Sequence, residues 1–152
     1  MHAFRLARQP YANSLSGKGA ALKGGRWNSA GIEMLYTAEN RSLAMAEVAV
    51  HFTLATLPED YMMVTLDIPD SLTMEELPES GLPLNWNVFP HLLTTQSLGD
   101  RFIQENKYPI LKVPSAVVKG DFNLLMNPNH PDFKKIRIHG IEAFPFDQRI
   151  FK

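Results

Sequence analysis

The chain contains no cysteine, so its sequence offers no disulfide, no thiolate nucleophile and no thiolate metal site. Its five histidines show neither the H-E-x-x-H nor the H-x₃₋₅-H spacing of common zinc sites. We therefore expect chemistry without a bound metal, and the lack of thiols is compatible with a reducing compartment.

Long apolar runs are also missing from the sequence. The longest apolar-rich stretch, residues 43–57, carries Glu47 and is shorter than the roughly 20 residues that span a bilayer. The first ten residues lack the apolar core of a secretory signal peptide. We expect a cytoplasmic protein that has no membrane partner.

An excess of either charge is absent as well, because 15 Lys and Arg residues oppose 16 Asp and Glu residues. This balance provides no bulk electrostatic reason to bind nucleic acid. The 152 residues, 45% of them hydrophobic, suffice for one core but not comfortably for two, and no repeat or linker interrupts them. We predict a single domain over residues 1–152.

Strand-like segments lie toward both ends of the sequence, and the helical patterns lie between them. The expected strands are 3–6, 34–38, 61–68, 110–113, 116–118, 123–126 and 136–144. The clearest helix, 41–56, begins after the capping residue Asn40 and is expected to end before Pro58, and a second helix, 88–106, is expected to be interrupted near Gly99. Five prolines within 58–90 predict loops and short pieces around the strand 61–68, and N-P-N-H-P at 127–131 predicts a tight turn. This order favours an α+β fold with a mixed or antiparallel sheet and flanking helices.

Residues 17–31, GKGAALKGGRWNSAG, hold five of the nine glycines. A P-loop is excluded because Gly19 follows Lys18 where Ser or Thr is required, and the Rossmann fingerprint fails at Leu22. The segment is therefore either a flexible loop or a surface against which a ligand docks. Arg26 could hold phosphate oxygens with its guanidinium fork, and the adjacent glycines, Gly24 and Gly25, would let the ligand approach the backbone.

Glu47 occupies an unusual position on the first helix. It is the only charged residue between Ser42 and Pro58, and it falls in the middle of the apolar face formed by Leu43, Ala46, Val50 and Leu54. An unpaired buried charge is costly. Glu47 therefore either meets a cation, for which Arg26 is the candidate, or meets hydrogen-bond donors, or lines a cavity.

Other polar and aromatic residues have both ordinary and functional interpretations. Trp27 is more typical of a core anchor than of a stacking surface, and Tyr36 suits a core strand equally well. Ser115, at the end of a predicted strand, fits a site or a simple turn.

Together, these blocks resemble the RES domain family across essentially the whole chain. The matching segments are Arg5-Leu6, S-G-K-G-A, G-G-R-W-N, L-Y-T-A, S-L-A-M-A-E, V-P-S-A, N-L-L-M-N-P-N-H-P and F-D-Q-R. The resemblance implies a fold similar to ADP-ribosyltransferases and the role of a toxin that degrades NAD⁺ and is restrained by an Xre-type antitoxin. One departure is Phe102, at a position where many relatives have tryptophan.

The resemblance also assigns roles to particular residues. It implies four catalytic positions, Arg26, Tyr36, Glu47 and Ser115, and five substrate-binding positions, Arg5, Gly24, Gly25, Trp27 and Asn123. NAD⁺ is then the substrate and no prosthetic group is expected. Cleavage of its glycosidic bond passes through an oxocarbenium-like ribose, which needs a nearby anion and a cation for the pyrophosphate.

Two other function classes remain open at this point. One is an ADP-ribosyltransferase that modifies a cellular protein, and the other is a non-enzymatic nucleotide-binding module in which Arg26 and Glu47 form a buried ion pair. The acceptor is undecided among water, phosphate and a protein side chain, and a homo-oligomer also stays open.

Overall fold

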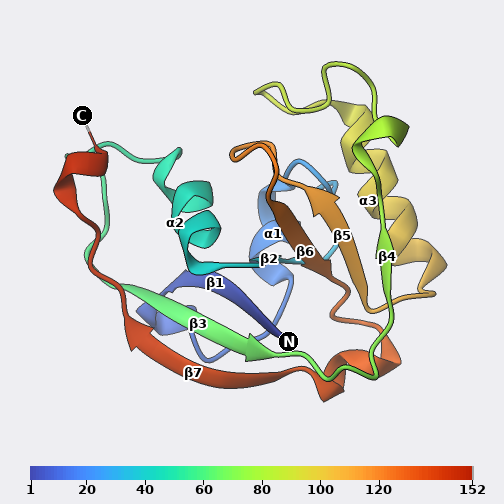
Figure 1. Ribbon diagram of the computed structural model, residues 1–152, viewed down its shortest axis with the longest axis horizontal. Coiled ribbons are helices and arrows are strands. Elements are labelled where there is room, and N and C mark those ends of the chain that lie inside the picture. The colour runs from blue at the N-terminus through green and yellow to red at the C-terminus, as the bar shows by residue number, and fades with distance from the viewer. Residues whose placement is uncertain (152) are drawn as a thin grey trace.

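The computed structural model describes residues 1–151 and is built on one seven-stranded sheet (Figure 1). The strands are β1 (His2–Arg8), β2 (Leu35–Ala38), β3 (Tyr61–Asp67), β4 (Met74–Glu76), β5 (Ile110–Pro114), β6 (Phe122–Met126) and β7 (Arg137–Ala143). Their order is β4-β5-β6-β2-β1-β3-β7, and only the β4–β5 pair is parallel. The mixed sheet confirms the predicted α+β class.

Three α-helices flank this sheet. They are α1 (Lys18–Lys23), α2 (Arg41–Ala49) and α3 (Leu93–Glu105). Figure 1 shows α2 beside β1 and β2, whereas α3 lies at the other end of the sheet, next to β4 and β5. No helix among residues 1–151 is both long enough and apolar enough to cross a bilayer.

Strand β3 is apolar on both sides because both of its sides are covered. In β3, Val64 and Leu66 belong to one buried cluster, and Met63 belongs to another that includes Leu43 of α2. This explains the nearly continuous apolar run of β3, which is typical of strands buried on both faces.

The expected helix 41–56 is too long. Its start is confirmed, because the Asn40 side chain accepts the backbone N–H of Leu43 over 2.8 Å. Its end is wrong, since the helix stops at Ala49 and leaves Val50 60% exposed. Beyond it, the hydroxyl of Thr56 accepts the backbone N–H of Thr53, and such local bonds compete with helical ones.

Three further expectations are corrected. The strand expected at 116–118 is a bend, because the hydroxyl of Ser115 accepts the backbone N–H groups of Val117 and Val118. Part of the expected glycine-rich loop forms α1. The second helix begins at Leu93 and continues through Gly99 without interruption, because this glycine is required for packing: a Cβ there would lie 1.6 Å from the Trp27 carbonyl oxygen.

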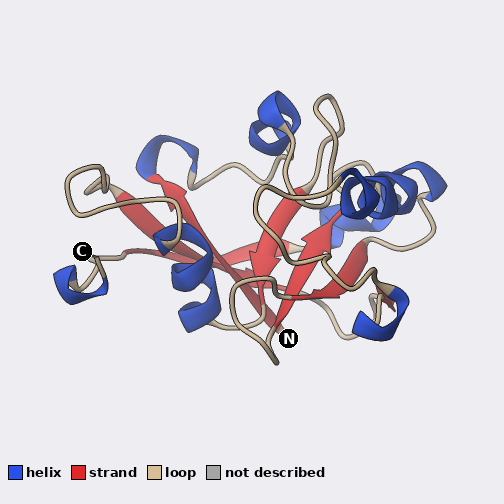
Figure 2. Ribbon diagram, turned by 90° about the horizontal axis from the view of Figure 1, so that it is seen from above, coloured by secondary structure: helices blue, strands red, loops and turns tan. Residues whose placement is uncertain are grey.

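The sheet opens between β1 and β2. These strands share a single register pair, Phe4 with Ala38, whereas β1 pairs with β3 along its whole length from His2 to Arg8. The two edges therefore diverge after Phe4. Figure 2 shows from above that the strands of the sheet run in widely different directions. Residues on both sides of the divergence, Arg5 and Leu6 of β1 and Tyr36 and Thr37 of β2, line a cavity.

Candidate active site

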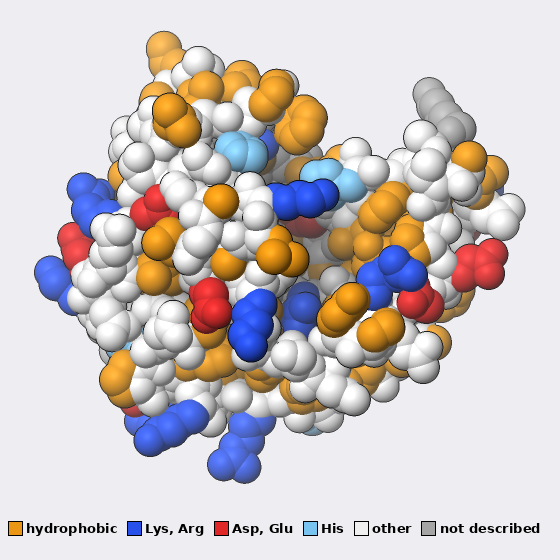
Figure 3. All heavy atoms as spheres, turned by 180° about the vertical axis from the view of Figure 1, so that it is seen from behind, with side chains coloured by type: hydrophobic (Ala, Val, Ile, Leu, Met, Phe, Trp, Pro, Cys, Tyr) orange, Lys and Arg blue, Asp and Glu red, His pale blue; other side chains and the backbone are white. Residues whose placement is uncertain are grey.

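Two adjoining cavities, of about 300 and 710 Å³, form one cleft beside α2. They share five lining residues: Arg26, Tyr36, Glu47, His51 and Ala116. Figure 3 shows this face of the molecule hollowed, with basic, acidic and histidine side chains at the hollow. The cavities lie in the size range typical of small-molecule sites.

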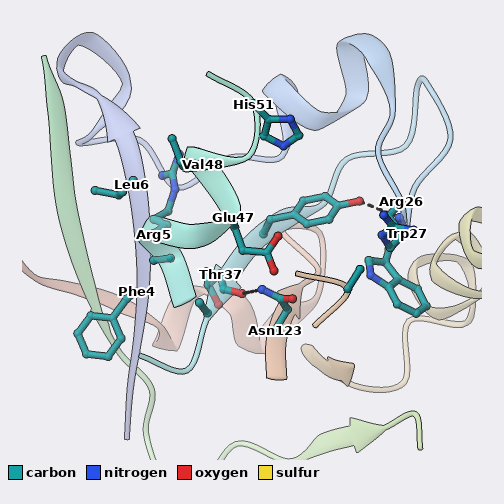
Figure 4. Close-up of a pocket in the computed structure, with 14 residues that line it drawn as sticks. Phe4, Arg5, Leu6, Arg26, Trp27, Thr37, Glu47, Val48, His51 and Asn123 are labelled. Carbon is teal, nitrogen blue, oxygen red and sulfur yellow. Dashed lines mark hydrogen bonds between the residues drawn. The ribbon is translucent and has the colours of Figure 1, made fainter. Parts of the chain in front are cut away.

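Glu47 points into the cleft from the last turn of α2 (Figure 4). Its Oε1 atom accepts the hydroxyl proton of Ser115 over 2.9 Å. That hydroxyl is buried and also accepts the backbone N–H groups of Val117 and Val118, each at 3.0 Å. Because both acceptor positions of the serine are occupied, its only proton is directed at Glu47.

Arg26 and Glu47 share the cleft, but within residues 1–151 they form no ion pair. The Nη1 atom of Arg26 instead donates to the carbonyl oxygens of Trp86 at 3.0 Å and Val88 at 2.9 Å. Burial lowers the pKa of Arg26, and the charge of Glu47 opposes this shift. The guanidinium is thus held by neutral carbonyls, which leaves its positive charge uncompensated by direct contact with a carboxylate of the described chain.

The hydroxyl of Tyr36 is fully engaged by the glycine-rich segment. It accepts the backbone N–H of Trp27 at 3.0 Å and donates to Asn28 Oδ1 at 2.6 Å. Burial raises the pKa of Tyr36, so the phenol stays protonated at neutral pH. The ring lines both cavities, and we infer that the ring, rather than the hydroxyl, faces a ligand.

Asn28 is a residue that the sequence analysis missed. It is fully buried, and its amide nitrogen donates to the carbonyl oxygens of Ala20, Ser29 and Ile32. The sequence feature that could have identified Asn28 is its position directly after Arg26-Trp27 in the G-G-R-W-N block. Asn28 fixes the backbone that presents Arg26.

Helix α3 anchors the same segment from outside the cleft. The amide nitrogen of Gln96 donates to the carbonyl oxygens of Gly25 at 3.0 Å and Asn28 at 3.1 Å. The carboxylate of Asp100 accepts both the backbone N–H and the hydroxyl of Ser29. Arg26 therefore extends from a loop that the rest of the fold holds in place.

The two glycines before Arg26 have a packing role. Gly24 has a φ of +78°, which favours glycine, and a Cβ on Gly25 would lie 2.8 Å from the Tyr36 hydroxyl. Both glycines line the larger cavity, as a ligand-binding role requires. The conformation and packing of the loop therefore also require glycine at these two positions, whether or not a ligand binds.

The remaining predicted residues line the smaller cavity. Arg5 donates from Nη1 to the carbonyl oxygen of Ser14, and burial lowers its pKa. Asn123 donates to the carbonyl oxygen of Thr37 at 3.2 Å. Trp27 borders the cavity but is a buried core residue, and Phe102 occupies the same cluster, so the phenylalanine is accommodated in this core.

Several cleft residues lay outside the sequence prediction. His51 lines both cavities, and the larger cavity is also lined by Asn87, Phe89 and His91. His51 lies inside the expected helix 41–56, and the other three residues lie around the expected start of the second helix at residue 88. Within residues 1–151, no group of three or more potential ligands could hold a metal ion.

Residues 2–148 match the family model described as the RES domain. The chain is 35% identical over 148 residues to the Prs ADP-ribosylating toxin of Sphingobium sp. (strain YBL2), covering 96% of this chain and 92% of that protein. It is 36% identical over 141 residues to Toxin Res of Pseudomonas putida, covering 90% of this chain and 92% of that protein.

A chain in the crystal structure of the M. tuberculosis MbcT-MbcA toxin-antitoxin complex superposes with a TM-score of 0.75. The match covers 95% of this chain and 84% of that chain at 20% sequence identity. This similarity supports the fold alone.

Proposed function

This chain belongs to the RES domain family, and we propose that it is a toxin that cleaves the nicotinamide–ribose bond of NAD⁺. The observation that carries the proposal is the hydrogen bond from Ser115 to Glu47, which orients a carboxylate inside the cleft. The same cleft holds an arginine that has no carboxylate partner among residues 1–151.

The position of Glu47 is unfavourable for stability alone. It lies in the last turn of α2, where the negative end of the helix dipole disfavours a carboxylate. It forms no ion pair within the described part of the chain. A residue that breaks such a local rule without a cation beside it is expected at functional sites.

The chemistry of NAD⁺ fits this arrangement. Nicotinamide leaves as a neutral base with the electron pair of the broken bond, and positive charge develops on the ribose. An oriented anion such as Glu47 stabilises that charge more than it stabilises the bound substrate. Ser115 keeps Glu47 Oε1 in place, and Oε2 is the atom available to the ribose.

Arg26 has the features of a pyrophosphate ligand. Its Nη1 atom is used by the protein, which leaves Nη2 and Nε for phosphate oxygens. Arg5 supplies a second positive charge on the smaller cavity, and the ring of Tyr36 offers a flat surface to the nicotinamide. Asn123 contributes a polar side chain to the wall of the smaller cavity.

A second candidate is supported by the name of one relative, the Prs ADP-ribosylating toxin. In that reaction, a protein side chain replaces water or phosphate as the acceptor of the ADP-ribosyl group. Both candidates require the same first event, release of nicotinamide, and they differ only in what then bonds to the ribose.

Product analysis tests the proposal. Purified protein is incubated with NAD⁺, with and without phosphate, and nicotinamide and the ribosyl product are quantified by chromatography. We expect nicotinamide release from the wild type and a large loss in Glu47→Gln. Bound NAD⁺ that stays intact after long incubation would instead support a non-enzymatic module.

A parallel incubation with labelled NAD⁺ and a cell extract distinguishes the acceptors. Free ADP-ribose or its phosphate ester formed without added protein supports cleavage by a small acceptor. Label on a protein, with nicotinamide released only when that protein is present, supports the second candidate.

We further propose that the toxin acts in the cytoplasm and is restrained by an Xre-type antitoxin that covers the cleft. A cytosolic enzyme that consumes NAD⁺ would need such restraint. Expression without the antitoxin should arrest growth together with loss of cellular NAD⁺. Growth arrest with unchanged NAD⁺ would contradict the proposed activity, and an antitoxin bound far from an open cleft would contradict the proposed mode of inhibition.

A further inference from the structure

The outer wall of the larger cavity carries an exposed aromatic ring that the cleavage chemistry does not use. Phe89 lines this cavity together with Asn87 and His91, yet it is 80% exposed. These residues belong to the irregular segment 86–92, which precedes α3. An exposed phenylalanine beside polar groups in a cavity suits contact with a flat ligand.

Segment 86–92 is fixed to the residues that hold the rest of the ligand. Arg26 Nη1 donates to the carbonyl oxygens of Trp86 and Val88, so Phe89 directly follows a residue bonded to the guanidinium. At the other end, the ring nitrogen Nε2 of His91 lies 3.1 Å from the amide nitrogen of Gln96. The backbone on both sides of Phe89 is therefore anchored, and its ring lines the same cavity as Arg26, the proposed pyrophosphate-binding residue.

The other lining residues provide apolar surface. Val50, just beyond α2, and Val117, in the bend after β5, line the same cavity as Phe89 and are both exposed. A planar base in this cavity would contact an aromatic ring and branched aliphatic side chains. The amide of Asn87 has both a donor and an acceptor for the edge of a base.

The two cavities differ in which half of a dinucleotide they can hold. The smaller, of about 300 Å³, lies at the divergence of β1 and β2, and the larger, of about 710 Å³, contains the loop glycines and segment 86–92. Arg26 and Glu47 line both. A dinucleotide with its pyrophosphate at Arg26 would thus extend its nicotinamide half toward the smaller cavity and its adenosine half toward the larger.

We propose that Phe89 and Asn87 form the adenine subsite of the cleft, with Phe89 stacking on the base and Asn87 contacting its edge. This proposal rests on NAD⁺ being the substrate. It makes segment 86–92 the part of the protein that distinguishes a dinucleotide from nicotinamide mononucleotide, which lacks the adenosine half.

Substrate comparison tests the subsite with Phe89→Ala. Stacking of a base on an aromatic side chain is worth a factor of about 5 to 150 in affinity. We expect the KM for NAD⁺ to rise within this range, with kcat nearly unchanged and cleavage of nicotinamide mononucleotide unaffected. Phe89→Trp, which keeps a stacking ring, should restore the low KM.

Leu84→Ala is the matched control. Leu84 is fully exposed, precedes α3 in the sequence as Phe89 does, and lines neither cavity. It should leave the KM for NAD⁺ unchanged. An equal loss in Leu84→Ala, an unchanged KM in Phe89→Ala, or an equal loss for both substrates would overturn the subsite. An unchanged KM in Phe89→Ala is the result expected if the exposed ring serves a protein partner instead.

Binding measurements separate this proposal from the proposed activity. If the wild type cleaves neither substrate, calorimetry with ADP-ribose and ribose 5-phosphate still reports on the subsite. Weaker binding of ADP-ribose alone by Phe89→Ala supports it. No binding of ADP-ribose by the wild type, or equal effects of the substitution on both ligands, overturns it.

Discussion

Ser115 donates its hydroxyl proton to Glu47 Oε1 over 2.9 Å, while two backbone N–H groups donate to the lone pairs of the serine oxygen. The bond joins α2 to the bend after β5, and the two bonded residues are 68 positions apart in the sequence. It gives Glu47 a fixed orientation toward the cleft without neutralising it, because a neutral hydroxyl is the donor.

Glu47→Gln should separate catalysis from folding. Since Glu47 has no ion-pair partner within residues 1–151, the substitution leaves no buried cation unpaired, and the melting temperature should change little. Removal of an oriented charge typically lowers the rate by about 10²–10³. Nicotinamide release should fall by at least this much, whereas a folded variant with near wild-type release would refute the catalytic role.

Ser115→Ala should reduce the rate through Glu47. The substitution also removes the acceptor of two N–H groups, so we expect a loss of about 1–3 kcal/mol in the free energy of unfolding. In a double-mutant cycle, the rate losses of Ser115→Ala and Glu47→Gln should be strongly non-additive. Additive losses would show that the serine acts independently, for example on the ribose.

Arg26→Lys should weaken substrate binding. A lysine is a point charge that cannot hold two carbonyl oxygens and a phosphate with a planar fork. Because the pyrophosphate is bound before and during the reaction, the main effect should be a higher KM for NAD⁺. Arg101→Lys, on the exposed part of α3, is the control, and a fall in kcat alone would argue against pyrophosphate binding by Arg26.

Tyr36→Phe tests whether the hydroxyl acts on the loop or on the substrate. The change removes a partner from both the Trp27 N–H and Asn28 Oδ1, which should cost about 1–3 kcal/mol of stability. The ring remains, so kcat should be largely retained while the looser Arg26 segment raises the KM. A collapse of kcat with unchanged stability would indicate direct participation of the hydroxyl in the reaction.

Gly99→Ala should destabilise the fold, although alanine normally favours a helix. A Cβ at this position would lie 1.6 Å from the Trp27 carbonyl oxygen, so α3 and the Arg26 segment would have to separate. Such overpacking costs about 1–3 kcal/mol and occasionally more. Denaturant unfolding measures the loss, and Gly81→Ala, where a Cβ would meet no atom within 4 Å, should be tolerated.

The sequence by itself determined the α+β class, most of the strands and the start of α2. Alternating or continuous apolar runs identify strands such as β3, and Asn40 identifies a helix start, because these signals depend on neighbours in the sequence. The resemblance carried by G-G-R-W-N, L-Y-T-A and V-P-S-A also singled out Arg26 and Tyr36, which line the cleft, and Ser115, which donates a hydrogen bond to Glu47 there.

Side-chain contacts decided where helices and strands end, and the local pattern of apolar and polar residues does not reveal these contacts. The sequence predicted a helix to Thr56 and a strand at 116–118, but the hydroxyls of Thr56 and Ser115 bond to the backbone there and form turns instead. Gly99 was expected to interrupt α3, yet it is the residue that lets the helix approach Trp27.

Only the tertiary structure decided how Glu47 is partnered. The sequence left an Arg26 ion pair, hydrogen-bond donors and a cavity position open, because all three fit a lone carboxylate on an apolar helical face. The fold gives Arg26 to the carbonyl oxygens of residues 86 and 88 and gives Glu47 to Ser115. These hydrogen bonds join segments that are distant in the sequence, and no local periodicity records such contacts. The folded chain places the carboxylate, the arginine and Phe89 around one cleft.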